Sequence, residues 1–100
     1  MTGLVVLGAT GSIGGSALEV VAQLDGRFVV VGLACHRDWR KLAALASRWR
    51  PEAVALGDEK AWLDAREAHA FDPGIEVLGG EEGVLALAQW ESATTVLNGL

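Results

Sequence analysis

The fold is decided by residues 4–14, which read Leu4-Val5-Val6-Leu7-Gly8-Ala9-Thr10-Gly11-Ser12-Ile13-Gly14. The first four residues form a continuous apolar run rich in β-branched side chains, which predicts a central strand buried on both faces. From Ile13 onward the apolar spacing changes to that of a helix, whose expected buried face carries Ile13, Ala17, Val20, Val21 and Leu24. The glycines therefore join a strand to a helix, which we expect to stop near Asp25-Gly26.

Strands and helices are expected to alternate along the rest of the chain. The pattern predicts strands at residues 28–34, 53–56, 75–78 and 94–97, and helices at 39–49, 59–69 and 81–90. Short connections and this alternation predict an α/β fold, a Rossmann-type doubly wound parallel sheet of about five strands in the order 3-2-1-4-5. Four tryptophans at apolar helical positions are expected in the core or at a domain contact: Trp39, Trp49, Trp62 and Trp90.

The turn between the first strand and the first helix has the spacing G-x-x-G-x-x-G. Gly8 permits a tight turn, Gly11 lets the backbone approach a pyrophosphate, and Gly14 lets the helix pack against the sheet. Free N–H groups at the start of the helix favour an anion. We therefore predict a dinucleotide site, with a purely structural turn as the alternative; its expected cofactor-binding residues here are Gly8, Thr10, Gly11, Ser12, Ile13 and Gly14.

Two serines in this region, Ser12 and Ser16, have the chemistry of a nucleophile. No histidine is placed to activate either one, so we interpret Ser12 as a helix-start residue that forms hydrogen bonds. We predict no catalytic residue in the chain.

The end of the second strand, which reads Ala34-Cys35-His36-Arg37-Asp38, decides which dinucleotide binds. An arginine at this place accommodates a 2′-phosphate, so Arg37 predicts a preference for NADPH over NADH. The alternative for Arg37 is a solvated side chain. Asp38 is interpreted first as the N-cap of the next helix, with a ribose contact as the alternative. His36, Arg37 and Asp38 complete the predicted cofactor-binding set.

Composition limits the function classes. The 100 residues are 51% hydrophobic and 21% charged, which suits one globular domain. The net charge is −5, but residues 1–50 carry a net of +3 and residues 51–100 a net of −8. The acidic total argues against a nucleic-acid surface, while the basic excess allows a small anionic ligand near the first half. We expect the acidic second half to lie mostly on helices away from the cofactor.

The numbers of cysteines and histidines and the lengths of the apolar runs exclude further classes of protein. Cys35 is the single cysteine, so no internal disulfide can form, and His36 and His69 are too few for a protein-only zinc site. We expect His69 to be a solvated side chain. The opening residues carry no secretion signal and no apolar run long enough for a membrane span, so we expect a cytoplasmic protein.

Several segments together carry a family resemblance. They are residues 4–14 with Ser16, Leu18 and Val20-Val21, the Phe28 strand, Pro51-Glu52-Ala53-Val54, Asp58-Glu59, and Val96-Leu97-Asn98-Gly99-Leu100. With these segments in this order, the chain resembles the amino-terminal part of the 1-deoxy-D-xylulose 5-phosphate reductoisomerase family. The order of segments agrees over the whole chain, but the specific motif lies mainly within residues 4–21.

The resemblance implies a function and a set of partners. Members of the family convert 1-deoxy-D-xylulose 5-phosphate to 2-C-methyl-D-erythritol 4-phosphate with NADPH and a divalent cation, Mg or Mn, in non-mevalonate isoprenoid biosynthesis. Residues 1–100 would be the NADPH-binding domain of such an oxidoreductase, inactive alone, with the cation and sugar-phosphate ligands beyond Leu100. The full-length enzyme would be a homodimer with no membrane or nucleic-acid partner. Thr10 to Ile13 and Arg37 match the family's cofactor positions, whereas His36 and Asp38 depart from it, so we expect only backbone contacts there.

Two other functions remain open from the residues alone. An aspartate-semialdehyde dehydrogenase-like domain also begins with a GATG turn, but it needs a catalytic cysteine elsewhere. A dinucleotide-sensing module would use the same fold without hydride transfer. The residues that follow would separate these classes: paired acids, a reactive cysteine, or neither.

Overall fold

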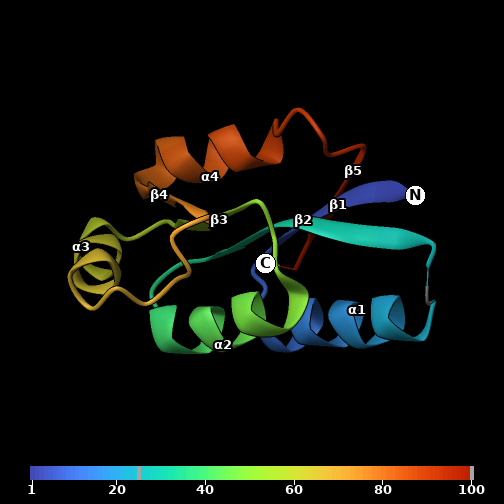
Figure 1. Ribbon diagram of the computed structural model, residues 1–100, viewed down its shortest axis with the longest axis horizontal. Helices are drawn as coiled ribbons and strands as arrows, with labels where there is room; N and C mark the ends of the chain where they lie inside the picture. The colour runs from blue at the N-terminus through green and yellow to red at the C-terminus, as the bar shows by residue number, and fades with distance from the viewer. Residues whose placement is uncertain (25, 100) are drawn as a thin grey trace.

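The computed structural model describes residues 1–24 and 26–99 as one sheet of five parallel strands with helices on both faces (Figure 1). The strands are β1 (Thr2–Leu7), β2 (Phe28–Cys35), β3 (Ala53–Leu56), β4 (Glu76–Gly79) and β5 (Thr95–Asn98). The helices are α1 (Ser12–Gln23), α2 (Trp39–Trp49), α3 (Glu59–Glu67) and α4 (Gly80–Ala88). The predicted α/β class and the alternation of elements are confirmed. Asp25, at the expected end of the first helix, and Leu100, the last residue of the resemblance, lie outside the described residues.

The strand order is β4-β3-β2-β1-β5, so the predicted order 3-2-1-4-5 is wrong. The predicted order placed the fourth strand beside β1, on the side of β1 away from β2 and β3. Instead, β4 continues outward and pairs with β3, and the chain then crosses the sheet through α4 to place β5 beside β1. A right-handed crossover in the reverse direction puts its helix on the opposite face, which is why α4 lies apart from the other helices. The direction in which successive strands are added to the sheet therefore reverses between β1 and β5.

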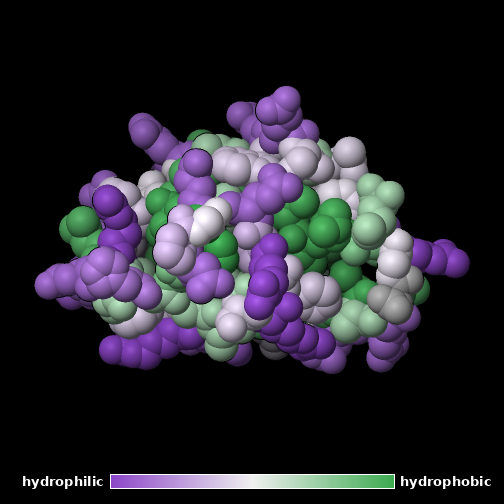
Figure 2. Space-filling view, in the orientation of Figure 1, coloured by the Kyte–Doolittle hydropathy of each residue, from purple (hydrophilic) through white to green (hydrophobic). Residues whose placement is uncertain are grey.

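Two apolar clusters hold the layers together. The larger packs α1, α2 and α3 against one face of the sheet, around Leu4, Leu33 and Val54. The smaller packs α4 against the other face through Leu87, over Val5 and Val31. Figure 2 shows hydrophobic residues in the band between the α4 layer and the α1–α2 layer, with hydrophilic side chains over the outer surfaces.

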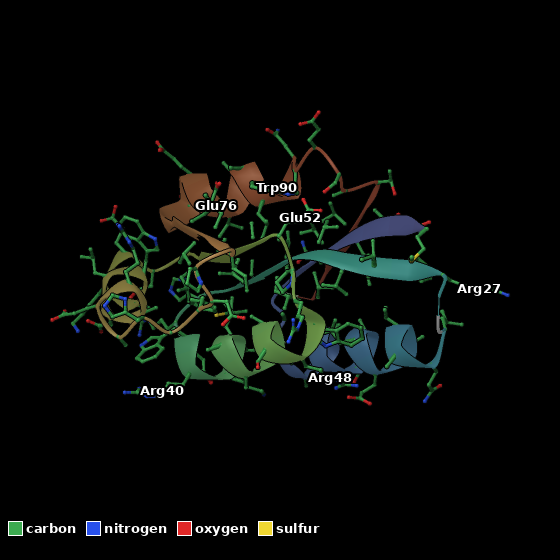
Figure 3. The ribbon with its side chains drawn as sticks, in the orientation of Figure 1. Arg27, Arg40, Arg48, Glu52, Glu76 and Trp90 are labelled. Atoms are coloured by element: carbon green, nitrogen blue, oxygen red, sulfur yellow. The ribbon has the colours of Figure 1, made fainter. Side chains whose placement is uncertain are left out.

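The tryptophans extend these clusters, as predicted. Trp39, Trp49 and Trp62 are partly buried against the larger cluster and Trp90 against the smaller one. The Trp90 indole also donates a hydrogen bond of 2.9 Å to Glu52 Oε1, which joins the loops that enter β3 and β5 (Figure 3). This contact lies at the amino ends of the strands, away from the Gly-rich turn.

The predicted buried face of the first helix is largely wrong. The residues of α1 that are buried are Gly14, Leu18 and Val21, whereas Ile13 is 62% and Val20 55% exposed. Both sets have helical spacing, and the set that starts at Gly14 is the one that turns toward the sheet. Glycine adds little to an apolar pattern, so the correct face carries the weaker signal.

Candidate functional site

The Gly-rich turn runs from the end of β1 to the start of α1. Gly8 adopts a left-handed φ of 69°, which a glycine accepts without strain. The Gly11 amide donates 3.1 Å to the Gly8 carbonyl oxygen, and this bond closes the turn. Gly11 is also the N-cap of α1, with extended backbone, and it has no side chain with which to cap the helix. The first amides of α1 are therefore available to an anion, because no acidic side chain stands in its first turn.

Gly14 brings α1 against the turn. A Cβ on Gly14 would overlap the Gly8 carbonyl oxygen and stand 2.9 Å from Ala9 Cα. Gly99, at the end of β5, approaches from the other side: a Cβ there would stand 2.8 Å from the Gly14 nitrogen, and the Gly99 amide donates 2.8 Å to the Leu7 carbonyl oxygen. The packing role predicted for Gly14 is confirmed. Sequence reasoning missed Gly99, because its place depends on β5 lying beside β1.

The loop after β2 holds the other three predicted residues. His36, Arg37 and Asp38 are all exposed at the carboxyl end of the sheet. Asp38 Oδ1 accepts a 3.2 Å hydrogen bond from the Lys41 amide and caps α2, so the N-cap interpretation is confirmed. Arg37 lines a separate hollow with Trp39, Asp58 and Lys60. The structure thus places Arg37 beside the start of α3.

A largely apolar groove of about 340 Å³ lies between the ends of β1, β2 and β3 and the first turns of α4. It brings Gly8 and His36 together, as predicted. It also contains residues that the sequence did not reveal, because α4 had to be placed on the correct face first. The lining residues are Leu7, Gly8, Ala34, Cys35, His36, Gly57, Glu81, Val84 and Leu85.

Glu81 is an exception to the expectation that the acidic half lies away from the site, since it lines this groove from the first turn of α4. Apart from Glu81 and His36, the residues that line the groove are mostly apolar, so the groove suits a flat, uncharged ring with polar edges. A carboxylate at its rim can accept hydrogen bonds from such a ring.

Thr10 links the Gly-rich turn to the loop after β2. Its side chain hydrogen bonds with the Cys35 thiol, and its carbonyl oxygen accepts a 2.8 Å hydrogen bond from Lys41 Nζ. The neighbouring Ala9 amide donates 2.8 Å to the Ala34 carbonyl oxygen. The two loops predicted to hold the cofactor therefore form one connected unit.

The thiol of Cys35 is buried within this unit. Burial raises the pKa of Cys35 from 9.0 to about 11, and the negative charge of the Asp38 carboxylate also raises it. The hydrogen bond with the Thr10 side chain partly opposes this increase. Because the unfolded thiol ionises near its ordinary value, the folded state should lose stability as the pH rises from about 9 to about 11. We expect the unfolding free energy of the wild type, measured in urea, to fall more over this interval than that of Cys35→Ala. An equal fall in both proteins would contradict the raised pKa.

The described residues form neither a metal site nor a membrane span. Among residues 1–24 and 26–99, no three His, Cys, Asp or Glu side chains gather closely enough to hold a metal ion. Over the same residues, no helix is both long enough and apolar enough to cross a membrane.

Comparison with known proteins gives one consistent family. The family model described as 1-deoxy-D-xylulose 5-phosphate reductoisomerase matches residues 4–100. The enzyme of that name from Moorella thermoacetica is 46% identical over 95 residues, which are 94% of this chain and 24% of the relative. The one from Acaryochloris marina is 38% identical over 101 residues, covering all of this chain and 25% of the relative. The chain therefore spans about a quarter of the length of these relatives.

Solved structures agree with this result. A crystal structure of DOX-P reductoisomerase in complex with NADPH, fosmidomycin and magnesium superimposes with a TM-score of 0.81 at 29% identity, covering 96% of this chain and 24% of that one. The Zymomonas mobilis reductoisomerase in complex with NADPH gives a TM-score of 0.80 at 30% identity, covering 91% of this chain and 24% of that one. With the strand order, the Gly-rich turn and the family match in agreement, this chain belongs to the 1-deoxy-D-xylulose 5-phosphate reductoisomerase family.

Proposed function

We propose that residues 1–100 form the NADPH-binding domain of a 1-deoxy-D-xylulose 5-phosphate reductoisomerase. The complete enzyme would convert 1-deoxy-D-xylulose 5-phosphate to 2-C-methyl-D-erythritol 4-phosphate in non-mevalonate isoprenoid biosynthesis. One observation carries the proposal: the uncapped start of α1 adjoins a groove at the carboxyl ends of the central strands, in a chain that matches the family over residues 4–100. The carboxyl ends of the strands, where the direction of the sheet reverses, are the usual ligand site of such folds.

The residues of this site fit the parts of NADPH. The backbone amides of Ser12 and Ile13 would hold the pyrophosphate, because the start of α1 offers N–H groups and no opposing charge. Gly11, whose amide closes the turn, would let the backbone approach it. The apolar groove beside His36 would take the adenine ring. Arg37, exposed after β2, would meet the 2′-phosphate through its planar guanidinium.

Asp38 would contribute through its backbone alone, since its carboxylate caps α2. The Thr10 carbonyl and side chain are both engaged within the protein, so Thr10 would shape the turn. NADPH, when bound, supplies a hydride, and this chain's residues bind and orient it. We assign no catalytic residue to residues 1–100.

A divalent cation does not fit the described residues, where no cluster of three suitable side chains exists. We therefore derive no step through a cation from this chain. The proposed full-length enzyme would hold Mg or Mn, and the sugar phosphate, on residues that follow this domain. We propose that it acts as a homodimer in the cytoplasm, without a membrane or nucleic-acid partner.

A chimeric enzyme tests the proposal. Residues 1–100 would replace the matching segment of the Moorella thermoacetica relative, which is 46% identical to this chain over 95 residues. The chimera should oxidise NADPH when 1-deoxy-D-xylulose 5-phosphate and Mg²⁺ are supplied. Omission of the sugar phosphate is the control for non-specific oxidation.

A folded chimera that binds the sugar phosphate but does not oxidise NADPH would contradict the proposal. The family match favours the reductoisomerase over an aspartate-semialdehyde dehydrogenase-like enzyme. The chimera also separates it from a non-catalytic sensing module, which would bind NADPH without turnover.

A further inference from the structure

Lys41 spans the gap between the two loops of the site. It lies in the first turn of α2, and its Nζ donates a 2.8 Å hydrogen bond to the Thr10 carbonyl oxygen, 31 residues earlier in the chain. Its own backbone amide is held by Asp38 Oδ1 at 3.2 Å. The N-cap therefore fixes the turn of helix from which Lys41 reaches the Gly-rich turn.

The contact acts on one peptide group. The carbonyl of Thr10 and the amide of Gly11 belong to the same planar unit and point in opposite directions. Lys41 binds the carbonyl end, while the Gly11 amide donates 3.1 Å to the Gly8 carbonyl oxygen at the other end. Hydrogen bonds at both ends prevent this peptide from rotating, so the direction of the following amides, at Ser12 and Ile13, is set before any ligand arrives.

We propose that Lys41 is a positioning residue that holds the Gly-rich turn in the form that receives a dinucleotide pyrophosphate. This inference rests on the proposed function for the identity of its ligand. A turn that is already ordered loses less conformational entropy when the ligand binds. Disorder of the turn would therefore weaken affinity without removing any contact to the ligand. The pyrophosphate is common to NADPH and NADH, so Lys41 acts on both equally, whereas Arg37 acts on the 2′-phosphate alone.

Substitutions of Lys41 test the role by calorimetric titration of the chain. Lys41→Met should weaken NADPH and NADH by about tenfold each, the size expected for one charge-assisted hydrogen bond. The ratio of the two affinities should stay constant. Lys41→Arg keeps a cationic donor and should stay within about threefold of the wild type.

Arg48→Met is the matched control. It removes one cation from the same helix, but Arg48 pairs with Glu19 at 3.2 Å on the outer surface and should leave both affinities unchanged (Figure 3). Unchanged affinities in Lys41→Met would overturn the proposal. A loss confined to NADPH would also overturn it, because Lys41 would then be a ligand of the 2′-phosphate.

Amide hydrogen exchange of the ligand-free chain gives a second readout. Lys41→Met should speed exchange at the Gly11 amide about tenfold, and Lys41→Arg should not. Equal protection in the wild type and Lys41→Met would overturn the positioning role. If the wild type binds neither dinucleotide, the proposed function is wrong, and so is the pyrophosphate as the ligand of the turn. The exchange rates would still decide whether Lys41 fixes the turn.

Discussion

Gly14→Ala should destabilise the folded chain by about 3 kcal/mol, at the upper end of what overpacking costs. The new methyl group would overlap the Gly8 carbonyl oxygen and stand 2.9 Å from Ala9 Cα. Both atoms belong to the backbone of the turn, so no side chain can move aside. Urea unfolding followed by circular dichroism measures the loss.

Gly15→Ala is the matched control for this prediction. Gly15 is the next residue of α1, and a Cβ on it would meet nothing within 4 Å. Alanine has the higher helix propensity, so this variant should gain up to about 1 kcal/mol. If the two variants had equal stability, the close approach of α1 to the turn would be refuted.

Arg37→Glu should weaken NADPH binding by about 100-fold or more, since it replaces a charge-assisted contact to the 2′-phosphate with repulsion. NADH lacks that phosphate, so its affinity should change by less than about threefold. Calorimetric titration with both cofactors measures the two effects in one preparation. Because Arg37 is exposed, Arg37→Glu should leave the fold intact.

Arg40→Glu supplies the control for the charge reversal itself. Arg40 is an exposed neighbour that lies over the Trp39 ring, 4.4 Å from its centroid, and extends outward from α2 (Figure 3). The same change of charge there should reduce NADPH affinity only slightly, through long-range attraction screened by salt. Equal losses of NADPH and NADH in Arg37→Glu would remove the 2′-phosphate role.

Local features of this fold could be predicted because each depends on neighbouring residues. The strand that ends at Leu7, the turn at Gly8 and the cap at Asp38 all follow from short spacings with a steric or hydrogen-bonding cause. Asp58, which directly precedes the helix expected at residues 59–69, likewise caps α3 by accepting a 3.0 Å hydrogen bond from the Ala61 amide. Such features need no knowledge of strand order.

The remaining parts of the site depend on the order of the strands. Gly99 meets Gly14 because β5 pairs with β1, and Val84 lines the groove because α4 crosses the second face of the sheet. Nothing in the sequence of β4 marks it as an edge strand, although Glu76 is exposed there. The contact from Lys41 to Thr10 has the same origin, since it joins the first turn of α2 to the Gly-rich turn, and the pairing of β1 and β2 brings these two segments together.

The most direct test of the central claim is a titration of the unmodified chain with NADPH and NADH, followed by the backbone amide signals. We predict saturable binding of NADPH, weaker binding of NADH, and shifts at Gly11, Ser12 and Ile13 with both. Shifts at Arg37 should occur with NADPH alone. A folded chain that binds neither dinucleotide, or that binds them without changes at the start of α1, would contradict the assignment of this site.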